Sequence, residues 1–342
     1  MSEFHLLKIS KLELLTKKAI AVSFEIPYQL MDRFSFISGQ YLTIELEIKG
    51  KTIRRSYSIC SNQDETLRIA IKKVEGGLFS SYALENFNLG DKIKVGEPEG
   101  RFIFKPGDKK ETITGIAAGS GITPILSIAK SCLSNNNKFR LIYGNKSPSE
   151  TMFFNEVNEL KEKYGNKFDL IWVYSEARKE NSYYGRIDAE IINYYFNNYT
   201  IANKYFLCGP KDMIDVVLNQ LSKNGVSTEN IFFELFTTSN SNLKVEKKST
   251  ITDLEIIYDG MTYLVKNIGG KKLLDAALEE NIDVPYSCQG GVCSSCLARI
   301  IKGKATMENN QILTDQEIKD GFILTCQAIS KESYIKIDFD DI

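Results

Sequence analysis

Histidine is nearly absent from this sequence. His5 is the one histidine among 342 residues, and it lies close to the N-terminus. Most catalysis that uses histidine as a general base is therefore excluded, and so is a zinc site that needs histidine ligands. We interpret His5 as an ordinary residue.

Long apolar runs are absent as well. No segment approaches the roughly 18 apolar residues of a membrane-spanning helix, and Met1–Lys11 lacks the apolar centre of a secretory signal peptide. We therefore expect a soluble, cytoplasmic protein. Because the formal net charge is −1, neither nucleic acid nor an anionic membrane surface is expected as a partner.

Three blocks of different pattern divide the chain. Residues 1–106 contain short alternating stretches separated by turns, which indicates an antiparallel β-barrel or β-sandwich. Residues 107–236 alternate apolar runs with helical stretches, one of them predicted over 150–164, as in a doubly wound α/β domain with a parallel sheet. Residues 237–250 have a linker composition, and 251–342 form a compact mixed α+β block.

Four of the seven cysteines lie in that last block. Their spacing is Cys288-x4-Cys293-x2-Cys296, with Cys326 after 29 more residues. This is the spacing of plant-type [2Fe–2S] clusters, in which two irons take four thiolates. Zinc held by four cysteines is the alternative, but such sites ordinarily use two C-x2-C pairs and the chain has one. The four cysteines are therefore the predicted metal ligands.

A cluster in a chain with a nucleotide domain predicts a flavin. A nicotinamide gives a two-electron hydride and a cluster carries one electron, so a flavin must stand between them. The stretch Arg54-Arg55-Ser56-Tyr57-Ser58 suits a phosphate and a flat ring, and Gly76-Gly77-Leu78-Phe79-Ser80-Ser81 precedes a helix, where phosphate is bound. Taken alone, each is equally consistent with an ordinary strand surface or a capped turn.

Two further motifs follow predicted parallel strands. Gly119-Ser120-Gly121-Ile122-Thr123-Pro124 allows the backbone to approach a pyrophosphate, although the third small residue of the usual fingerprint is missing. Cys208-Gly209-Pro210 stands where α/β sheets bind ligands. Its thiol is interpreted as a nicotinamide contact, with a buried structural cysteine as the alternative.

In this order, and over nearly the whole chain, the motifs resemble the ferredoxin–NADP reductase-like superfamily with a C-terminal [2Fe–2S] ferredoxin domain. The resemblance is greatest to the reductase components that serve oxygenases, hydroxylases and desaturases, such as that of phenylacetyl-CoA oxygenase. It implies a flavin-binding β-barrel, a doubly wound nucleotide domain and a β-grasp ferredoxin domain.

The resemblance also implies site residues. The expected catalytic residues are Cys208, Ser58 and Glu234. The expected cofactor-binding residues are Arg55, Tyr57, Ser58, Gly77, Leu78, Phe79, Ser80, Gly119, Gly121, Thr123, Gly209 and Pro210. FAD is expected rather than FMN, which one branch of the family uses. Glu176 favours NADH over NADPH, although Arg178 and Lys146 can still reach a 2′-phosphate.

The expected function is electron transfer from NAD(P)H through FAD and the cluster to a partner oxygenase, hydroxylase or desaturase, which can itself be membrane-bound. The alternative is a redox-sensing or electron-carrier subunit without NAD(P)H turnover of its own.

Overall fold

The structure is a computed structural model that describes residues 3–236 and 252–342. The predicted linker, 237–250, lies outside these residues. The chain divides into two compact units, the larger of which is Phe4–Phe236. None of the helices among the described residues combines the length and the apolar composition that crossing a bilayer requires.

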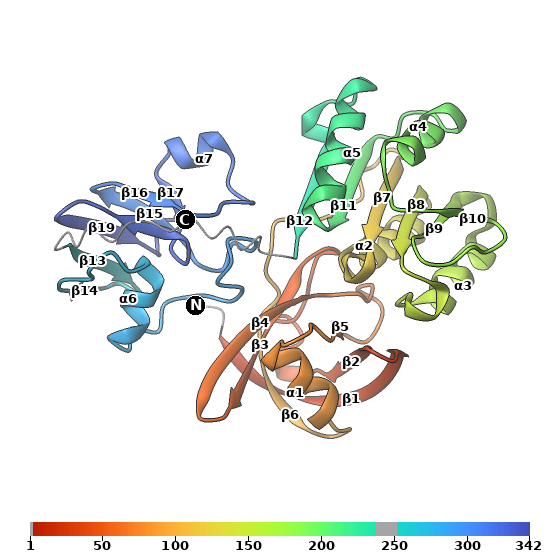
Figure 1. Cartoon of the computed structure of the whole chain (residues 1–342). Coiled ribbons are helices and arrows are strands. Elements are labelled where there is room, and N and C mark those ends of the chain that lie inside the picture. The colour runs from red at the N-terminus through yellow and green to blue at the C-terminus, as the bar shows by residue number, and fades with distance from the viewer. Residues whose placement is uncertain (1–2, 237–251) are drawn as a thin grey trace. The chain divides into compact units, whose positions relative to one another are not determined.

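The first part of the larger unit is an antiparallel β-barrel (Figure 1). Its strands are β1 (Phe4–Thr16), β2 (Ala19–Glu25), β3 (Tyr41–Ile48), β4 (Lys51–Ser58), β5 (Arg68–Lys72) and β6 (Lys92–Gly96), in the order β4-β3-β6-β1-β2-β5. A bridge between Ile59 and Ile69 joins the two edges of this sheet and closes it. Helix α1 (Leu78–Asn86) contributes Phe79 and Ala83 to the apolar core of the barrel.

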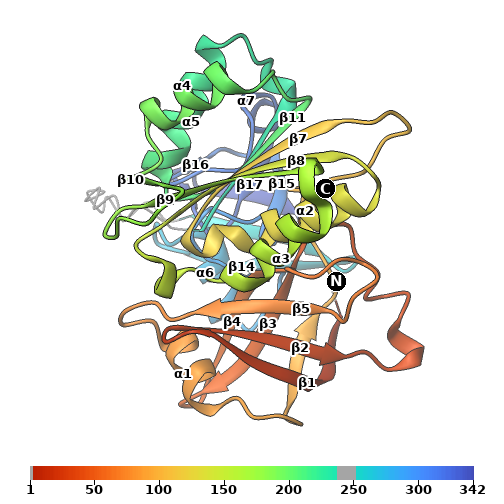
Figure 2. The same cartoon turned by 90° about the vertical axis from the view of Figure 1, so that its right-hand side faces the viewer.

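The second part is a six-stranded parallel sheet between two layers of helices. Its strands are β7 (Thr112–Ala118), β8 (Lys138–Asn145), β9 (Phe168–Tyr174), β10 (Ser182–Tyr184), β11 (Lys204–Gly209) and β12 (Ile231–Leu235). Its helices are α2 (Ile122–Ser134), α3 (Phe154–Tyr164), α4 (Ala189–Asn198) and α5 (Lys211–Lys223). Helices α2 and α3 cover one face and α4 and α5 the other (Figure 2). This is the predicted doubly wound sheet.

The order of this sheet is β10-β9-β8-β7-β11-β12, with every pair parallel. The chain runs outward from β7 to β10 and then returns to the other side of β7 to form β11. The switch point, where α/β sheets bind their ligands, therefore lies between the carboxyl ends of β7 and β11.

The barrel and the parallel sheet share one apolar core. Ala21 of β2 and Ala70 of β5 belong to the same buried cluster as the apolar residues of α2. Phe206 of β11 lies with its ring centroid 5.4 Å from that of Phe102 and 4.9 Å from that of Phe232. Because these side chains are small or closely packed, the barrel and the sheet are held as one body.

The C-terminal unit has the topology of a β-grasp. Its elements are β13 (Asp253–Tyr258), β14 (Met261–Val265), α6 (Leu273–Glu279), β15 (Leu297–Lys302), β16 (Ala305–Met307), α7 (Asp315–Lys319), β17 (Phe322–Leu324), β18 (Ala328–Ser330) and β19 (Tyr334–Asp338). The main sheet runs β14-β13-β19-β15-β17, and α6 packs its apolar side into the core. The parallel pair β13 and β19 lies at its centre.

One predicted helix starts later than expected. The predicted helix over 150–164 begins at Phe154, because Pro148–Glu150 forms a separate 3-10 turn and Phe153 has a φ of +58°. A left-handed residue cannot continue a right-handed helix, so the chain turns there before α3 begins. The apolar periodicity of the sequence gives no sign of this left-handed residue before α3.

The shared core predicts a large loss of stability for Phe206→Ala. Removing a ring that is 1% exposed leaves a cavity between the barrel and the sheet and should cost about 3–5 kcal/mol. The measurement is thermal unfolding followed by the fluorescence of Trp172, the one tryptophan, which lies in this unit. Leu14→Ala is the control: Leu14 is 72% exposed, and the expected change is below about 0.5 kcal/mol. Equal losses in the two variants would contradict the prediction.

Candidate functional site

The two adjacent arginines on β4 have different environments. Arg54 is buried, and its Nε donates to Glu45 at 2.8 Å. Arg55 points to the other side of the strand and is exposed, with its guanidinium donating to the carbonyl of Arg54 at 2.6 Å. Arg54 is therefore a structural residue of the barrel, whereas Arg55 faces solvent, as its predicted contact with a phosphate requires.

Tyr57 connects β4 with the amino end of α1. Its ring centroid lies 5.6 Å from that of Phe79, which is buried in the first turn of the helix. Gly77 precedes the helix, and a Cβ there would lie 3.0 Å from the carbonyl oxygen of Val74. No side chain caps α1, so the amide groups of its first turn remain suited to phosphate. The two predicted flavin stretches thus meet in space.

The remaining residues of this stretch are Leu78 and Ser80. Leu78 is 44% exposed, whereas Ser80 is buried. The Ser80 hydroxyl accepts a hydrogen bond from the amide of Val74 at 3.0 Å. This bond fixes the turn before α1 and still leaves the hydroxyl hydrogen of Ser80 as a donor.

Ser58, at the end of β4, meets the parallel sheet. Its Oγ donates to Oε2 of Glu234 on β12 at 3.5 Å. Burial raises the pKa of Glu234 to about 8, although the hydrogen bond from Ser58 lowers it. The Glu234 side chain is therefore a neutral acid through most of the neutral range, close to the junction of barrel and sheet.

Cys208 lies beside Glu234 in the register of β11 and β12. Its side chain is fully buried, and burial, followed by the nearby Glu234, raises the pKa of its thiol. The structure thus places Cys208 at the predicted location but as a protonated thiol enclosed by protein. Its predicted role as a nicotinamide contact stays a prediction.

Glycines allow close backbone packing at the switch point. A Cβ on Gly121 would lie 2.1 Å from the carbonyl oxygen of Cys208, so no larger residue fits. Gly119 has a φ of +56°, and its carbonyl accepts a hydrogen bond from the buried Tyr143 hydroxyl at 3.0 Å. Gly209 closes β11, where a Cβ would lie 3.3 Å from the amide nitrogen of Ala118. Backbone therefore lines the switch point at the carboxyl ends of β7 and β11.

The last two predicted residues lie at the amino ends of α2 and α5, the helices that follow β7 and β11. Thr123 is buried in the first turn of α2, and its hydroxyl donates to the carbonyl of Ser120 at 3.0 Å. Pro210 is exposed and precedes α5 as its N-cap residue. Both helices therefore begin at the switch point, with their amino ends toward it.

Lys72 is a residue that sequence reasoning missed. It ends β5 of the barrel, and its Nζ lies 3.6 Å from the position that a Cβ on Gly119 would take. Burial lowers the pKa of its ammonium group, against the opposing charge of Glu150. A lysine at the end of an alternating strand was the available signal, but the sequence does not show that this strand end faces the glycine turn.

The ends of β8 and β9 hold the residues on which the predicted preference for NADH rests. Lys146 Nζ lies 2.9 Å from Glu176 Oε1, and both side chains are exposed. The guanidinium of Arg178 lies 4.6 Å from the ring centroid of Tyr184. Lys146, one of the two cations that could reach a 2′-phosphate, is thus already paired with Glu176.

In the C-terminal unit, the four predicted ligand thiols converge. Cys288 is within hydrogen-bonding distance of Cys293 and Cys326, and Cys326 is also within that distance of Cys296. All seven cysteines lie within the described residues, and each is a free thiol. Four free thiols gathered in this way, three of them buried, are suited to bind a metal cluster.

The loop around the thiols has the shape that a cluster needs. The amide of Gly290 donates to Sγ of Cys288 at 3.3 Å. Gly291 has a φ of +76°, and a Cβ there would lie 2.7 Å from the carbonyl oxygen of Asn309. Gln327 also approaches Cys326, with its Nε2 3.7 Å from the sulfur. The residues present therefore fit a [2Fe–2S] cluster, with amide donors already aimed at sulfur.

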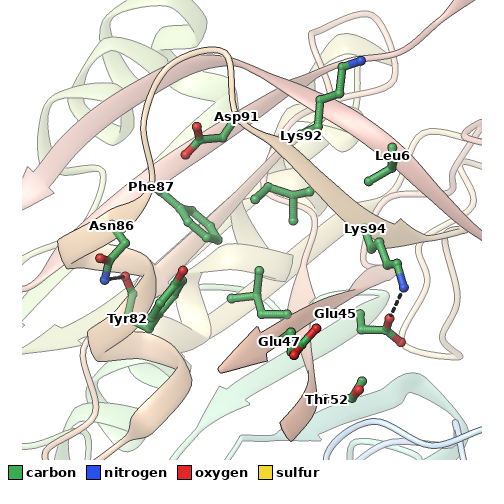
Figure 3. A pocket seen from close by; sticks show the side chains of 12 residues that line it. Leu6, Glu45, Glu47, Thr52, Tyr82, Asn86, Phe87, Asp91, Lys92 and Lys94 are labelled. Atoms are coloured by element: carbon green, nitrogen blue, oxygen red, sulfur yellow. Dashed lines mark hydrogen bonds and ion pairs between the residues drawn. The ribbon is translucent and has the colours of Figure 1, made fainter. Parts of the chain in front are cut away.

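A separate hollow of about 430 Å³ lies between β3, β6 and α1 (Figure 3). An ion pair between Lys94 and Glu45, at 2.8 Å, closes one end of it, and Tyr82 and Asn86 of α1 line the other. No predicted site residue lines this hollow. We therefore assign it no part in the site.

Comparison with known proteins accounts for this arrangement. Three family models match successive stretches: an oxidoreductase FAD-binding domain at 6–104, an oxidoreductase NAD-binding domain at 116–219 and a 2Fe-2S iron-sulfur cluster binding domain at 256–331. The chain is 34% identical to a component of the 1,2-phenylacetyl-CoA epoxidase of Escherichia coli (strain K12), over 99% of both chains. The chain belongs to the ferredoxin–NADP reductase-like flavoproteins with a C-terminal [2Fe–2S] domain.

Two further likenesses agree with this family. The ferredoxin reductase component of 3-ketosteroid-9-alpha-monooxygenase from Rhodococcus rhodochrous is 29% identical, over 93% of this chain and 92% of that protein. The solved structure of phthalate dioxygenase reductase shares the fold, with a TM-score of 0.65 over 98% of both chains at 23% identity. The predicted family, fold class and cofactors are confirmed. The reductase is an NAD(P)H-dependent flavoprotein oxidoreductase that uses FAD and a [2Fe–2S] cluster.

Because Gly121 packs against the carbonyl group of Cys208, we predict that Gly121→Ala slows hydride transfer from NADH to the flavin. The new methyl group must displace the backbone of β11 or α2, and displacements of about 1 Å slow reactions by up to about a hundredfold. The measurement is the rate of flavin bleaching by NADH under anaerobic conditions. Gly107→Ala is the matched control, since nothing lies within 4 Å of a Cβ there. Equal rates in the two variants would refute the prediction.

The raised pKa of Glu234 predicts a pH-dependent stability. The folded protein binds this proton more tightly than the unfolded chain, so its stability falls as the pH rises from about 4.5 to about 8. Glu234→Gln removes that titration. Its melting temperature should therefore rise relative to the parent between pH 5 and pH 8, whereas the exposed-site control Glu229→Gln should follow the parent. A constant difference between Glu234→Gln and the parent would count against the assignment.

Proposed function

We propose that this reductase delivers electrons from NAD(P)H, by way of FAD and the [2Fe–2S] cluster, to a separate oxygenase component. One observation carries the proposal: a single chain combines a glycine-lined switch point, a flavin-type junction at Ser58 and Glu234, and four converging thiols. The relatives named above are parts of an epoxidase and a monooxygenase. Epoxidases and monooxygenases both insert oxygen into a substrate, which supports an oxygenase as the acceptor.

The free thiols bear on the cellular compartment of the reductase. Seven free thiols, four of them gathered as ligands, support a reducing compartment, for which we propose the cytoplasm. The acceptor is a separate protein, so a hydroxylase or desaturase, free or attached to a membrane, is compatible with this reductase. We propose a flavin domain at 1–106, a nucleotide domain at 107–236, a linker at 237–250 and a ferredoxin domain at 251–342.

Residues of the barrel would hold the flavin. FAD, when bound, accepts a hydride from NAD(P)H and releases its electrons singly. Arg55 would pair with its phosphates, and the first turn of α1, with Gly77 to Ser80, would bind the pyrophosphate through backbone amides. Tyr57, braced by Phe79, would lie along the flavin ring, and Ser58 would hydrogen-bond its polar edge.

Residues of the parallel sheet would shape the reacting side. Glu234 holds a proton at the junction up to a pH of about 8 and keeps Ser58 oriented. Cys208 fills the space beside it as a small protonated group and excludes water. Thr123, in the first turn of α2, would stand next to the flavin. These residues would orient the reacting groups and exclude water from the site. Hydride transfer of this kind needs no histidine as a general base.

The nucleotide would bind across the switch point. Gly119, Gly121 and Gly209 let the backbone approach it, and the amino end of α5 after Pro210 would favour its negative charge. Lys72 adds a positive charge from the barrel at the same turn. We propose a preference for NADH, because Glu176 already neutralises Lys146 where a 2′-phosphate would need it.

Rapid anaerobic mixing with NADH tests the whole route. We expect the flavin to bleach first and the cluster to be reduced afterwards, whereas a redox-sensing or carrier subunit would show no bleaching. Cys326→Ser should lose the cluster absorbance and the reduction of a protein acceptor while its flavin still bleaches. Cys132→Ala, a buried cysteine outside the group, should retain all three signals. Acceptor reduction that survives in Cys326→Ser would overturn the proposed exit through the cluster.

A further inference from the structure

Away from the reacting groups, four charged side chains of alternating sign connect the barrel with the nucleotide domain. Glu65 and Arg68 come from the barrel side, Lys130 from α2 and Glu156 from the first turn of α3. Lys130 Nζ lies 2.6 Å from Glu65 and 2.5 Å from Oε1 of Glu156, and Arg68 Nη2 lies 2.5 Å from the same oxygen. We call these four residues the interdomain ion chain.

The inner members of the ion chain are shielded from water. The exposed fractions are 8% for the Lys130 side chain, 14% for Arg68 and 22% for Glu156. Burial raises the pKa of Glu156, but the charges of Lys130 and Arg68 outweigh this effect and the pKa is lowered. Glu156 is therefore ionised, and its Oε1 contacts both Lys130 and Arg68, whereas Glu65 contacts Lys130. Removing one member of such a group leaves uncompensated charge inside the protein.

The backbone before Glu156 is held in an unusual conformation. Phe153, the residue before α3, is buried and has a φ of +58°, which bulky side chains rarely adopt. Its ring centroid lies 5.2 Å from the guanidinium carbon of Arg68. Strain of this kind persists where the surroundings impose it. The contact with the barrel therefore fixes both the side chain of Glu156 and the start of its helix.

Short stretches of chain join this region to the site. The Ser127 hydroxyl of α2 donates to the carbonyl of Ser61 at 2.8 Å, and Ser61 follows Ser58 by three residues. On the other side, α2 carries Thr123 in its first turn and Lys130 about two turns later. A shift of α2 against the barrel would consequently change the separation of Thr123 and the glycine turn from Ser58.

We propose that Glu156 is a positioning residue for hydride transfer: by holding Lys130 and Arg68 together, it fixes the nicotinamide side of α2 against the flavin side of the barrel. The inference rests on the proposed function and names a residue outside the cofactor sites. Without the carboxylate of Glu156, Lys130 keeps only its pair with the more exposed Glu65, Arg68 loses its partner, and the repulsion between the two cations moves α2 away from the barrel.

The test compares Glu156→Gln with the double variant Glu156→Gln/Lys130→Met, and uses Asp215→Asn as the control. Asp215 belongs to an exposed ion pair on α5. In Glu156→Gln, with its FAD content unchanged, we expect flavin bleaching by NADH to slow by about tenfold to a hundredfold, with little change in KM. The double variant removes the repulsion and should recover most of the rate. Asp215→Asn should match the parent.

A second readout does not depend on turnover. Hydrogen exchange of the FAD-loaded protein should speed up in Glu156→Gln over residues 59–67 and α2, and return toward the parent in the double variant. A lower melting temperature with a parent-like bleaching rate would reduce Glu156 to a structural role and overturn the proposal. Equally slow bleaching in the single and double variants would overturn it too.

Two further outcomes are also decisive. If Glu156→Gln does not retain FAD, the double variant alone is informative. Flavin bleaching at the parent rate then supports the role of the ion chain, and slow bleaching contradicts it. If NADH does not bleach the parent itself, the proposed function fails. Hydrogen exchange then still tests the ion chain, since unchanged exchange in Glu156→Gln contradicts it.

Discussion

The packing of α2 against the barrel is the contact on which the site depends. The barrel supplies Ser58 and Tyr57, and the parallel sheet supplies Glu234 and the glycine turn, so neither part forms the junction alone. Small side chains such as Ala21 allow the approach, and the shared apolar core stabilises it without directional bonds. Polar contacts at the edge of this core, such as the hydrogen bond from Ser127 to Ser61, also join α2 to the barrel.

A second constraint is the exclusion of water at the junction. A half-buried carboxyl group on β12 and a fully buried thiol on β11 lie side by side, and desolvation raises the pKa of both groups. The opposite holds in the C-terminal unit, where four thiols are gathered to be deprotonated by metal. Cysteine is thus an isolated buried thiol at Cys208, whereas Cys326 lies in a group of four thiols that is predicted to bind the cluster.

Much of this was predictable because the decisive signals are local. Cysteine spacing predicts the cluster, and glycines before helices predict the phosphate sites, since backbone geometry leaves few other residue types at those positions. Sequence could not reveal Lys72 beside Gly119 or Glu156 between two cations, because both depend on how the barrel meets the sheet. The late start of α3 was missed for a related reason: tertiary contact holds Phe153 in a conformation that its own propensity disfavours.

The central expectation for this chain is that it stores both the electron pair of a hydride and a single electron. An anaerobic titration with NADH, followed by flavin absorbance and by electron paramagnetic resonance, measures this capacity directly. Since a flavin takes two electrons and the cluster one, reduction should be complete at about one and a half equivalents of NADH, with a reduced-cluster signal at the end point. An end point at one equivalent without that signal would contradict the account.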